Sequence, residues 1–270
     1  MPRRILFHPG FHKTGTSSMQ HFLWSNRTRL APHAQILLLR HLQAAAKICM
    51  FYSHSQNGLA LTDIVETMDQ ILAAHLPPGS GDGDLVISCE GLSGHLPGWP
   101  RVESYVAAPV TAAYLTGYLA ERFPQAKIQI VYSTRDPESW LHSAWRHHLL
   151  SHRMTLDWAD YAARFAGSAD LAGIAAQVAE SLSPLPVFTL PLEEAQNHPQ
   201  GPGGALLELL DLPDAVRDQL MPVGHGNRGP DPATATQLLD LNRSGMTDAA
   251  VRAEKARLVA QAGTGGWQPG

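Results

Sequence analysis

Cysteine is scarce in this chain: of its 270 residues, only Cys49 and Cys89 are cysteine. Two cysteines cannot build the disulfide framework of a small secreted protein, and a reducing compartment is the simpler expectation. Long apolar runs are also missing. The run Ile5-Leu6-Phe7 behind the N-terminal arginines is far too short for a signal peptide, and no stretch approaches the length of a membrane span. We therefore expect a cytoplasmic protein with no transmembrane segment.

The chain also lacks an excess of positive charge, since 20 lysines and arginines stand against 24 aspartates and glutamates, for a net charge of -4. Nucleic-acid binding needs a basic field, so we expect no nucleic-acid partner, and any anionic ligand must be held by local groups. Hydrophobic residues make up 44% of the chain, which excludes a disordered protein and suffices for one sizeable core. We expect one domain over residues 1–262 and a flexible, glycine-rich tail over 263–270.

Histidine is frequent, but its fourteen copies are scattered. His147, His148 and His152 share one predicted helix, yet no cysteine or carboxylate stands near them at the spacing of metal ligands. We therefore interpret the histidines as surface and supporting residues, and we expect no metal site.

Short apolar runs alternate along the chain with segments whose apolar residues recur every three or four positions. Strands that alternate with helices favour a parallel sheet covered on both faces, so we predict a three-layer α/β fold with a central parallel sheet flanked by helices. The predicted strands cover residues 4–8, 35–39, 84–88, 127–133 and 186–190. The predicted helices cover residues 15–31, 59–76, 111–123, 137–150, 157–165 and 170–182.

The first predicted strand runs into a loop, residues 10–18, that opens the first helix and makes the predicted fold P-loop-like. A helix N-terminus presents unpaired amides and the positive end of the helix dipole, and therefore attracts phosphate. Gly15 lets the backbone approach an anion closely, and Lys13 adds a mobile positive charge. An ordinary helix cap explains one or two hydroxyl residues, but this loop has four, so we predict that it binds a nucleotide phosphate. The four hydroxyl residues are Thr14, Thr16, Ser17 and Ser18.

This loop departs from the pattern of the common nucleoside-triphosphate loop, Gly-x-x-x-x-Gly-Lys-Ser/Thr. His12 precedes the lysine where that pattern has glycine, and the spacing from Gly10 is too short. We also find no second strand that ends in an aspartate suited to a metal. A kinase or other phosphotransferase on the same fold is therefore an alternative of lower rank, and a non-catalytic nucleotide-binding protein is another.

A second candidate phosphate site follows the predicted strand at residues 127–133. Arg135 stands at the strand end, where α/β folds usually bind ligands, and its guanidinium offers paired donors to a phosphate. Asp136 is a good N-cap for the next helix, and Ser143 returns to nearly the same face two turns later. We predict that Arg135 and Ser143 meet one phosphate. The alternative for Arg135 is an ion pair with Asp136 or Glu138.

Both segments resemble the sulfotransferases that use 3′-phosphoadenosine 5′-phosphosulfate (PAPS). Residues 10–18 are similar to the 5′-phosphosulfate-binding loop of that family, and the Lys-Thr-Gly-Thr core is similar to that of its carbohydrate and bacterial members. Residues 131–143 resemble the 3′-phosphate-binding segment, in which a serine follows a strand-end arginine eight residues later. The resemblance implies that Lys13 contacts the bridging oxygen of the leaving phosphate and that residues 14–18 hold the 5′-phosphate. Arg135 and Ser143 would hold the 3′-phosphate.

The activity implied by this resemblance is in-line transfer of a sulfuryl group from PAPS to a hydroxyl or an amine, with 3′-phosphoadenosine 5′-phosphate (PAP) as product and no metal. The acceptor stays open between a sugar hydroxyl, a lipid-linked glycan, a small metabolite and an amine. We expect the helices of residues 151–182 and the loop of residues 91–108 to shape its pocket. The oligomeric state is also open.

Sulfuryl transfer needs a base that takes the proton of the acceptor. Glu90 follows the predicted strand 84–88 and should project toward the same edge of the sheet as Lys13. Some members of the resembled family use glutamate at a comparable point and others use histidine, so His12 and His95 are rival candidates. The resemblance also implies a late arginine on the 3′-phosphate, which would be Arg228, although a plain surface loop explains that segment equally well.

Overall fold

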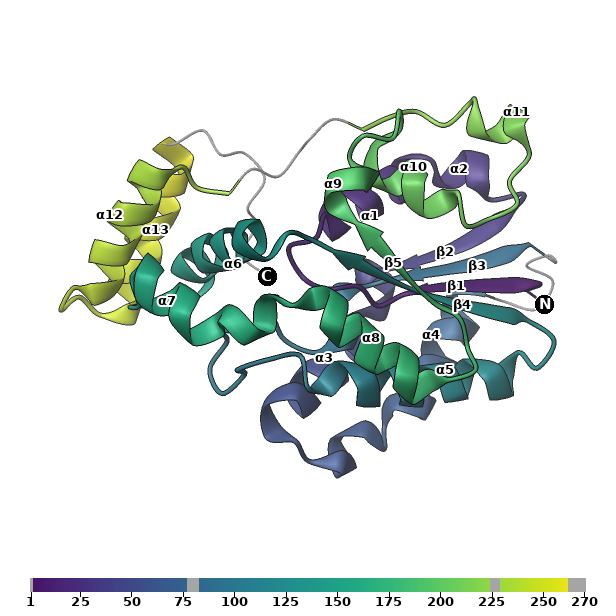
Figure 1. Cartoon of the computed structure of the whole chain (residues 1–270), viewed down its shortest axis with the longest axis horizontal. Coiled ribbons are helices and arrows are strands. Elements are labelled where there is room, and N and C mark those ends of the chain that lie inside the picture. The colour runs from purple at the N-terminus through teal and green to yellow at the C-terminus, as the bar shows by residue number, and fades with distance from the viewer. Residues whose placement is uncertain (1, 77–82, 224–228, 262–270) are drawn as a thin grey trace.

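The computed structural model describes residues 2–76, 83–223 and 229–261 of the chain. Within these residues, the strands form one sheet in the order β2-β3-β1-β4-β5, and every neighbouring pair is parallel (Figure 1). Because all the strands are parallel, their carboxyl ends lie at one edge of the sheet. The strands are β1 (Arg4–His8), β2 (Ala34–Leu38), β3 (Asp84–Ser88), β4 (Lys127–Thr134) and β5 (Val187–Pro191).

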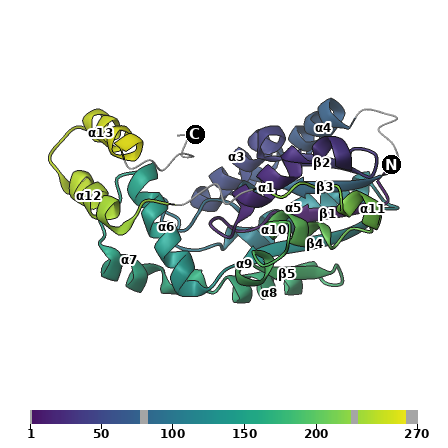
Figure 2. The same cartoon turned by 90° about the horizontal axis from the view of Figure 1, so that it is seen from above.

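Helices cover both faces of the sheet (Figures 1 and 2). One face carries α1 (Thr16–Ser25), α2 (Arg27–Leu30), α9 (Leu192–Ala195), α10 (Gly201–Leu207) and α11 (Asp214–Arg217). The other carries α3 (Leu39–Ser55), α4 (Ile64–His75), α5 (Ala107–Arg122) and α8 (Leu171–Leu182). Beyond the carboxyl ends of the strands lie α6 (Pro137–Ser151), α7 (Trp158–Phe165), α12 (Pro232–Arg243) and α13 (Asp248–Gln261). Short 3-10 turns are η1 (Gly58–Leu61), η2 (Glu90–Ser93) and η3 (Ala166–Ala169).

The central strand explains why both faces are covered. Successive side chains of a strand point to opposite faces. In β1, Ile5 and Phe7 pack into the core cluster that contains residues of α3, α4, α5 and α8, whereas Leu6 packs with residues of α1, α2 and α10. All three side chains are fully buried or nearly so. The predicted α/β fold, a central parallel sheet flanked by helices, is therefore confirmed.

The predicted elements match the structure at the strands and differ at several helices. The helix predicted over residues 15–31 is broken at Asn26, whose side-chain amide donates to the carbonyl of Phe22 and to that of Met221. Helix α3 (Leu39–Ser55) was not predicted at all, and it begins at the residue where we expected the second strand to end. The predicted flexible tail, residues 263–270, lies outside the described residues.

Two further features bear on the sequence-based expectations. Cys49 and Cys89 are both buried and free. None of the helices in the described part of the chain is long and apolar enough to cross a membrane.

Candidate functional site

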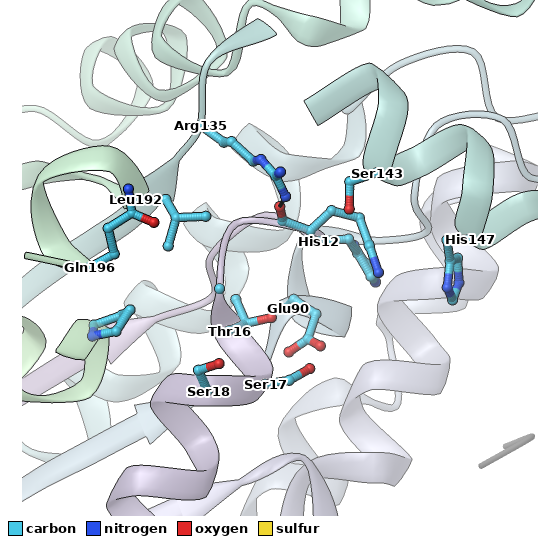
Figure 3. A pocket seen from close by; sticks show the side chains of 13 residues that line it. His12, Thr16, Ser17, Ser18, Glu90, Arg135, Ser143, His147, Leu192 and Gln196 are labelled. Carbon is cyan, nitrogen blue, oxygen red and sulfur yellow. Dashed lines mark hydrogen bonds between the residues drawn. The ribbon is translucent and has the colours of Figure 1, made fainter. Parts of the chain in front are cut away.

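A pocket of about 280 Å³ opens at the carboxyl edge of the sheet (Figure 3). It is lined by the loop between β1 and α1, the start of η2, the β4–α6 junction and the segment after β5. The structure therefore brings together the two predicted phosphate segments and the predicted base. The lining residues are His12, Lys13, Gly15, Thr16, Ser17, Ser18, Glu90, Arg135, Ser143, His147, Leu192, Gln196 and Pro202.

The β1–α1 loop holds its shape through left-handed backbone at three positions. Gly10 and Gly15 have φ of 59° and 88°, where glycine carries no steric penalty. Lys13 has φ of 68°, which is costly for a residue with a side chain and is typical of functional loops. Beyond Gly15, helix α1 has no side-chain cap, and no described group accepts a hydrogen bond from the amides of Thr16 and Ser17. Two amides at the helix N-terminus are therefore free for an anion.

The side chain of Lys13 lines the pocket and has no ion-pair partner among the residues that the structure describes. Burial lowers its pKa, the positive charge of Arg135 lowers it further, and the carboxylate of Glu90 acts in the opposite direction. Two cations thus share this pocket with one carboxylate. Such a surplus of buried positive charge favours an anionic ligand.

Arg135 is fixed in place by groups of the protein itself. Its Nη1 donates to the carbonyl of Lys13 over 3.1 Å, and its Nε donates to the hydroxyl of Ser139 over 2.9 Å. The alternative of an ion pair with Asp136 or Glu138 is not found, because Asp136 instead caps α6 by accepting from the amide of Ser139. Nη2 has no described partner and is left for a ligand.

Thr14 differs from its neighbours in the loop. Its side chain is fully buried and does not line the pocket. Its hydroxyl donates to the carbonyl of Phe11 over 2.6 Å and lies 2.6 Å from the hydroxyl of Ser133. Because this hydroxyl is engaged inside the protein, we correct the expectation that it contacts a phosphate: Thr14 supports the loop from behind.

His8, at the end of β1, completes the support behind the loop. Its Nε2 lies 3.1 Å from the hydroxyl of Ser133, and its Nδ1 lies 2.9 Å from that of Ser88. Thr14 donates its only hydroxyl proton to a carbonyl, so Ser133 must donate to Thr14 and accept from Nε2 of His8. His8 is therefore the Nε2–H tautomer, and burial lowers its pKa to about 4. This chain of hydrogen bonds ties the ends of β1, β3 and β4 to the loop.

Three further contacts hold the loop backbone. The indole of Trp140 donates to the carbonyl of His12 over 2.9 Å, and the hydroxyl of Tyr105 accepts from the amide of the same residue over 3.0 Å. The hydroxyl of Ser93 donates to the carbonyl of Gly10 over 2.7 Å. The donors that face the pocket are thus held in position before any ligand arrives, which is the arrangement that electrostatic catalysis requires.

Glu90 follows β3 and lines the pocket, as predicted from its place in the sequence. Its Oε2 accepts a hydrogen bond from the side-chain amide of Gln20 over 2.6 Å. Among the rival bases, His12 also lines the pocket, but burial and the neighbouring His95 and Lys13 lower its pKa to about 3. His95 is not a lining residue, and burial lowers its pKa to about 4. Position in the pocket therefore keeps Glu90 and His12 as candidates for the base and removes His95.

Several residues at the site escaped the sequence analysis. His147 lines the pocket, so the interpretation of the histidines as surface and supporting residues fails for this one. His8 and His148 are fully buried and do not line the pocket, which agrees with a supporting role. The signal for His147 was its position four residues after Ser143, which places both on one face of α6. Leu192, Gln196 and Pro202 also line the pocket but carried no recognisable pattern.

Two predictions remain without a structural answer. Arg228 lies outside the described residues, so its expected contact with a 3′-phosphate stays a prediction. The expected absence of a metal site also stays a prediction. Within residues 2–76, 83–223 and 229–261, no group of three or more His, Cys, Asp or Glu side chains could hold a metal ion.

Comparison with known proteins gives little guidance. No protein-family model matches the chain, and a search of curated proteins finds no match. Among solved structures, a sulfotransferase from Alicyclobacillus acidocaldarius is similar at 16% identity and a TM-score of 0.46, over 97% of this chain and 96% of that one. A retinol dehydratase in complex with androsterone and inactive cofactor PAP is similar at 13% identity and a TM-score of 0.36, over 100% of this chain and 84% of that one. Both TM-scores are below 0.5, so the function must be inferred from the residues of the pocket.

Proposed function

We propose that this chain is a sulfotransferase that moves a sulfuryl group from PAPS to a hydroxyl of an acceptor. One observation carries the proposal: two separate sets of anion-binding groups line a single pocket. One set is Lys13 with the free amides at the start of α1, and the other is Arg135 with Ser143. A nucleotide with phosphates at two ends suits both sets at once, and PAPS is such a nucleotide.

The residues present suit the ends of PAPS in different ways. The amides of Thr16 and Ser17 and the hydroxyls of Ser17 and Ser18 are donors for the 5′-phosphate. The free Nη2 of Arg135 and the hydroxyl of Ser143 are donors for the 3′-phosphate. A nucleotide with phosphates at its 5′ and 3′ positions would give each set a partner.

Transfer is proposed to proceed in one step. The acceptor oxygen forms a bond to sulfur while the bond from sulfur to the 5′-phosphate oxygen breaks, and that oxygen keeps the electron pair. Lys13 and the amides of α1 stabilise the charge that develops on the departing phosphate, a kind of interaction that is often the largest single contribution to catalysis. Glu90 takes the proton that the acceptor hydroxyl loses, which contributes roughly 10²–10⁴-fold.

Ligand-linked stabilisation tests the nucleotide half of this proposal. We expect PAP to raise the melting temperature well above the effect of AMP, ADP or ATP with magnesium at equal concentration, because only a ligand that binds the folded state tightly stabilises it. ATP with magnesium stabilising the protein as strongly as PAP would support a phosphotransferase instead.

A lysine pair tests the catalytic half. Lys13→Met removes the charge that we place on the leaving oxygen, so transfer of labelled sulfate from PAPS should fall by roughly 10²-fold or more. The matched control is Lys127→Met, since Lys127 is exposed at the amino end of β4, at the opposite edge of the sheet. Full activity in Lys13→Met protein would remove the lysine from the mechanism.

A further inference from the structure

Five partly buried rings form a group that begins at the pocket, where two of them line it, and continues beyond the lining residues; we name them the ring cluster. The imidazole of His95 stacks on Trp99 with centroids 4.8 Å apart and planes 5° apart, and Trp99 meets the imidazole of His152 edge-on at 5.3 Å. His12 and His147 line the pocket itself. In the view of Figure 3 these two imidazoles lie across the pocket from Leu192 and Gln196.

The two halves of the ring cluster are close neighbours. The imidazole of His147 lies 5.8 Å from that of His148, which in turn lies 4.6 Å from that of His152, centroid to centroid. His95 and His12 are also near enough for His95 to lower the pKa of His12. The loop after β1, the loop after η2 and the end of α6 therefore bring these rings to the same place. The stack of His95 on Trp99 extends the cluster beyond the lining of the pocket.

A fully buried imidazole anchors the ring cluster from beneath. Nε2 of His148 lies 2.9 Å from the carbonyl of Pro97, and Nδ1 lies 3.3 Å from Nδ1 of His152. The neighbouring backbone is so close that a Cβ on Gly98 would come within 2.7 Å of the same imidazole. The cluster is thus built on a rigid support, unlike a chance gathering of surface rings.

The ring cluster carries little charge near neutral pH. Burial is the largest cause that lowers the pKa of His12 and His147 to about 3, and that of His95 and His152 to about 4. The charged groups that act on these four imidazoles are Lys13 and, next to His152, Lys255. Lys255 is buried and donates to the carbonyls of Leu150 and His152, so it is not free for a ligand.

We propose that the ring cluster is the acceptor subsite and that it takes an uncharged sugar, a substrate class that rests on the proposed sulfuryl transfer. A sugar ring has apolar faces for the plane of Trp99 and hydroxyls for imidazole nitrogens, each of which donates or accepts a hydrogen bond. An anionic acceptor would find Lys13 already engaged with the donor phosphate. An acceptor that is apolar apart from its one hydroxyl would shield ring nitrogens from water without offering them hydrogen bonds, which costs binding free energy.

Matched glycosides test this substrate class directly. Protein and PAPS are incubated with neutral p-nitrophenyl glycosides, namely the β-glucoside, β-galactoside, β-N-acetylglucosaminide and β-xyloside, and with the β-glucuronide. The glucuronide has a carboxylate where the glucoside has its hydroxymethyl group, and the xyloside lacks that hydroxymethyl group without gaining a charge. We expect at least one neutral glycoside to be sulfated about ten-fold or more faster than the glucuronide. Equal or faster sulfation of the glucuronide, or no sulfation of any glycoside by protein that binds PAP in calorimetry, overturns the proposal.

Two tryptophan variants separate the subsite from general packing. Trp99→Ala should raise KM for the neutral glycoside about ten-fold while the Kd for PAP stays unchanged, and Trp99→Phe should recover most of the loss. The control is Trp158→Ala, because Trp158 also stacks on a histidine, His142, with centroids 3.5 Å apart, yet its ring contacts are with His142 and Trp145 and not with the ring cluster. An unchanged KM in Trp99→Ala, or an equal rise in Trp158→Ala, counts against the subsite. Wild-type protein that does not bind PAP would instead overturn the proposed function.

Discussion

The side-chain amide of Gln20 donates a hydrogen bond to Oε2 of Glu90 over 2.6 Å, across 70 positions of sequence. Gln20 lies on α1, whose first turn supplies the amides of the phosphate loop, and Glu90 lies at the start of η2. The bond therefore connects the element that would hold the donor phosphate to the carboxylate that would receive the acceptor's proton. It also occupies one oxygen of Glu90 and leaves the other for the acceptor.

Gln20 is predicted to orient Glu90 without touching the nucleotide. Gln20→Met removes the hydrogen bond at nearly constant volume, so the rate of sulfuryl transfer should fall by roughly ten-fold, in line with the loss of a hydrogen bond to a charged group. The Kd for PAP in calorimetry should change by less than about two-fold. A matched control is Gln70→Met, which removes an exposed Gln–Glu hydrogen bond on α4 far from the pocket. A parallel loss of PAP affinity would show that Gln20 acts on the loop and not on Glu90.

Arg135 is predicted to distinguish PAP from nucleotides without a 3′-phosphate. Arg135→Lys keeps a positive charge but cannot donate at once to Lys13, to Ser139 and to a phosphate. Its Kd for PAP should rise by roughly 10–100-fold, while the Kd for AMP should change much less. Calorimetry with both nucleotides measures this, with Arg164→Lys as the control, because Arg164 pairs with Glu103 at the surface. If Arg135→Lys weakened the affinity for PAP and for AMP equally, Arg135 would not be the residue that binds a 3′-phosphate.

The part of the site that could be predicted from the sequence is clearest at β1 and β3, the strands that lead to Lys13 and Glu90. The first and third strands were predicted with the bounds that the structure has, since both are unbroken apolar runs buried on both faces. Parallel strands put their ends at one edge, so Lys13, Glu90 and Arg135 could be expected in one pocket before any coordinates were known. Helix α3 was missed because alanines and a cysteine make up much of its buried face, which gives a weak hydrophobic period.

The roles of individual side chains were harder to predict because they depend on contacts between distant residues. Four hydroxyl residues in one loop look alike in the sequence. Only the contact between Thr14 and Ser133, 119 positions apart, shows that one hydroxyl points into the protein. The hydrogen bond between Gln20 and Glu90 and the ring contact of Trp99 with His152 likewise join residues that are far apart in the sequence. Composition and spacing do not encode such contacts, whereas the fold determines them.

Gly15 is predicted to be essential at its position, just before α1. Its φ of 88° disfavours any residue with a side chain, and a Cβ there would come within 2.7 Å of Leu192 Cδ1. Gly15→Ala should therefore lower the free energy of unfolding by about 1–2 kcal/mol and should weaken PAP binding by displacing the loop amides. Gly117→Ala, in the interior of α5 with open space around it, should instead stabilise the protein by about 0.5–1 kcal/mol. Chemical denaturation measures both, and wild-type stability in Gly15→Ala would contradict the left-handed loop.

Stability is predicted to fall as the pH drops below neutral, with His8 as one defined contributor. Burial lowers the pKa of His8 from 6.5 to about 4, so between these values the unfolded chain binds a proton that the folded chain does not. The free energy of unfolding therefore decreases as the pH falls from 6.5 to 4, by about 1.4 kcal/mol per pH unit and on the order of 3 kcal/mol in all for His8.

Two variants isolate this contribution. His8→Gln removes the titrating group, so the slope of unfolding free energy against pH between 4.5 and 6 should become smaller by roughly 1 kcal/mol per unit. Ser133→Ala removes a partner of the imidazole but keeps the imidazole itself buried. Because burial is the largest cause of the low pKa, Ser133→Ala should lower stability at every pH and keep the wild-type slope. Denaturant titrations across this pH range distinguish the two variants. A His8→Gln protein with the wild-type slope would show that folding does not lower the pKa of His8.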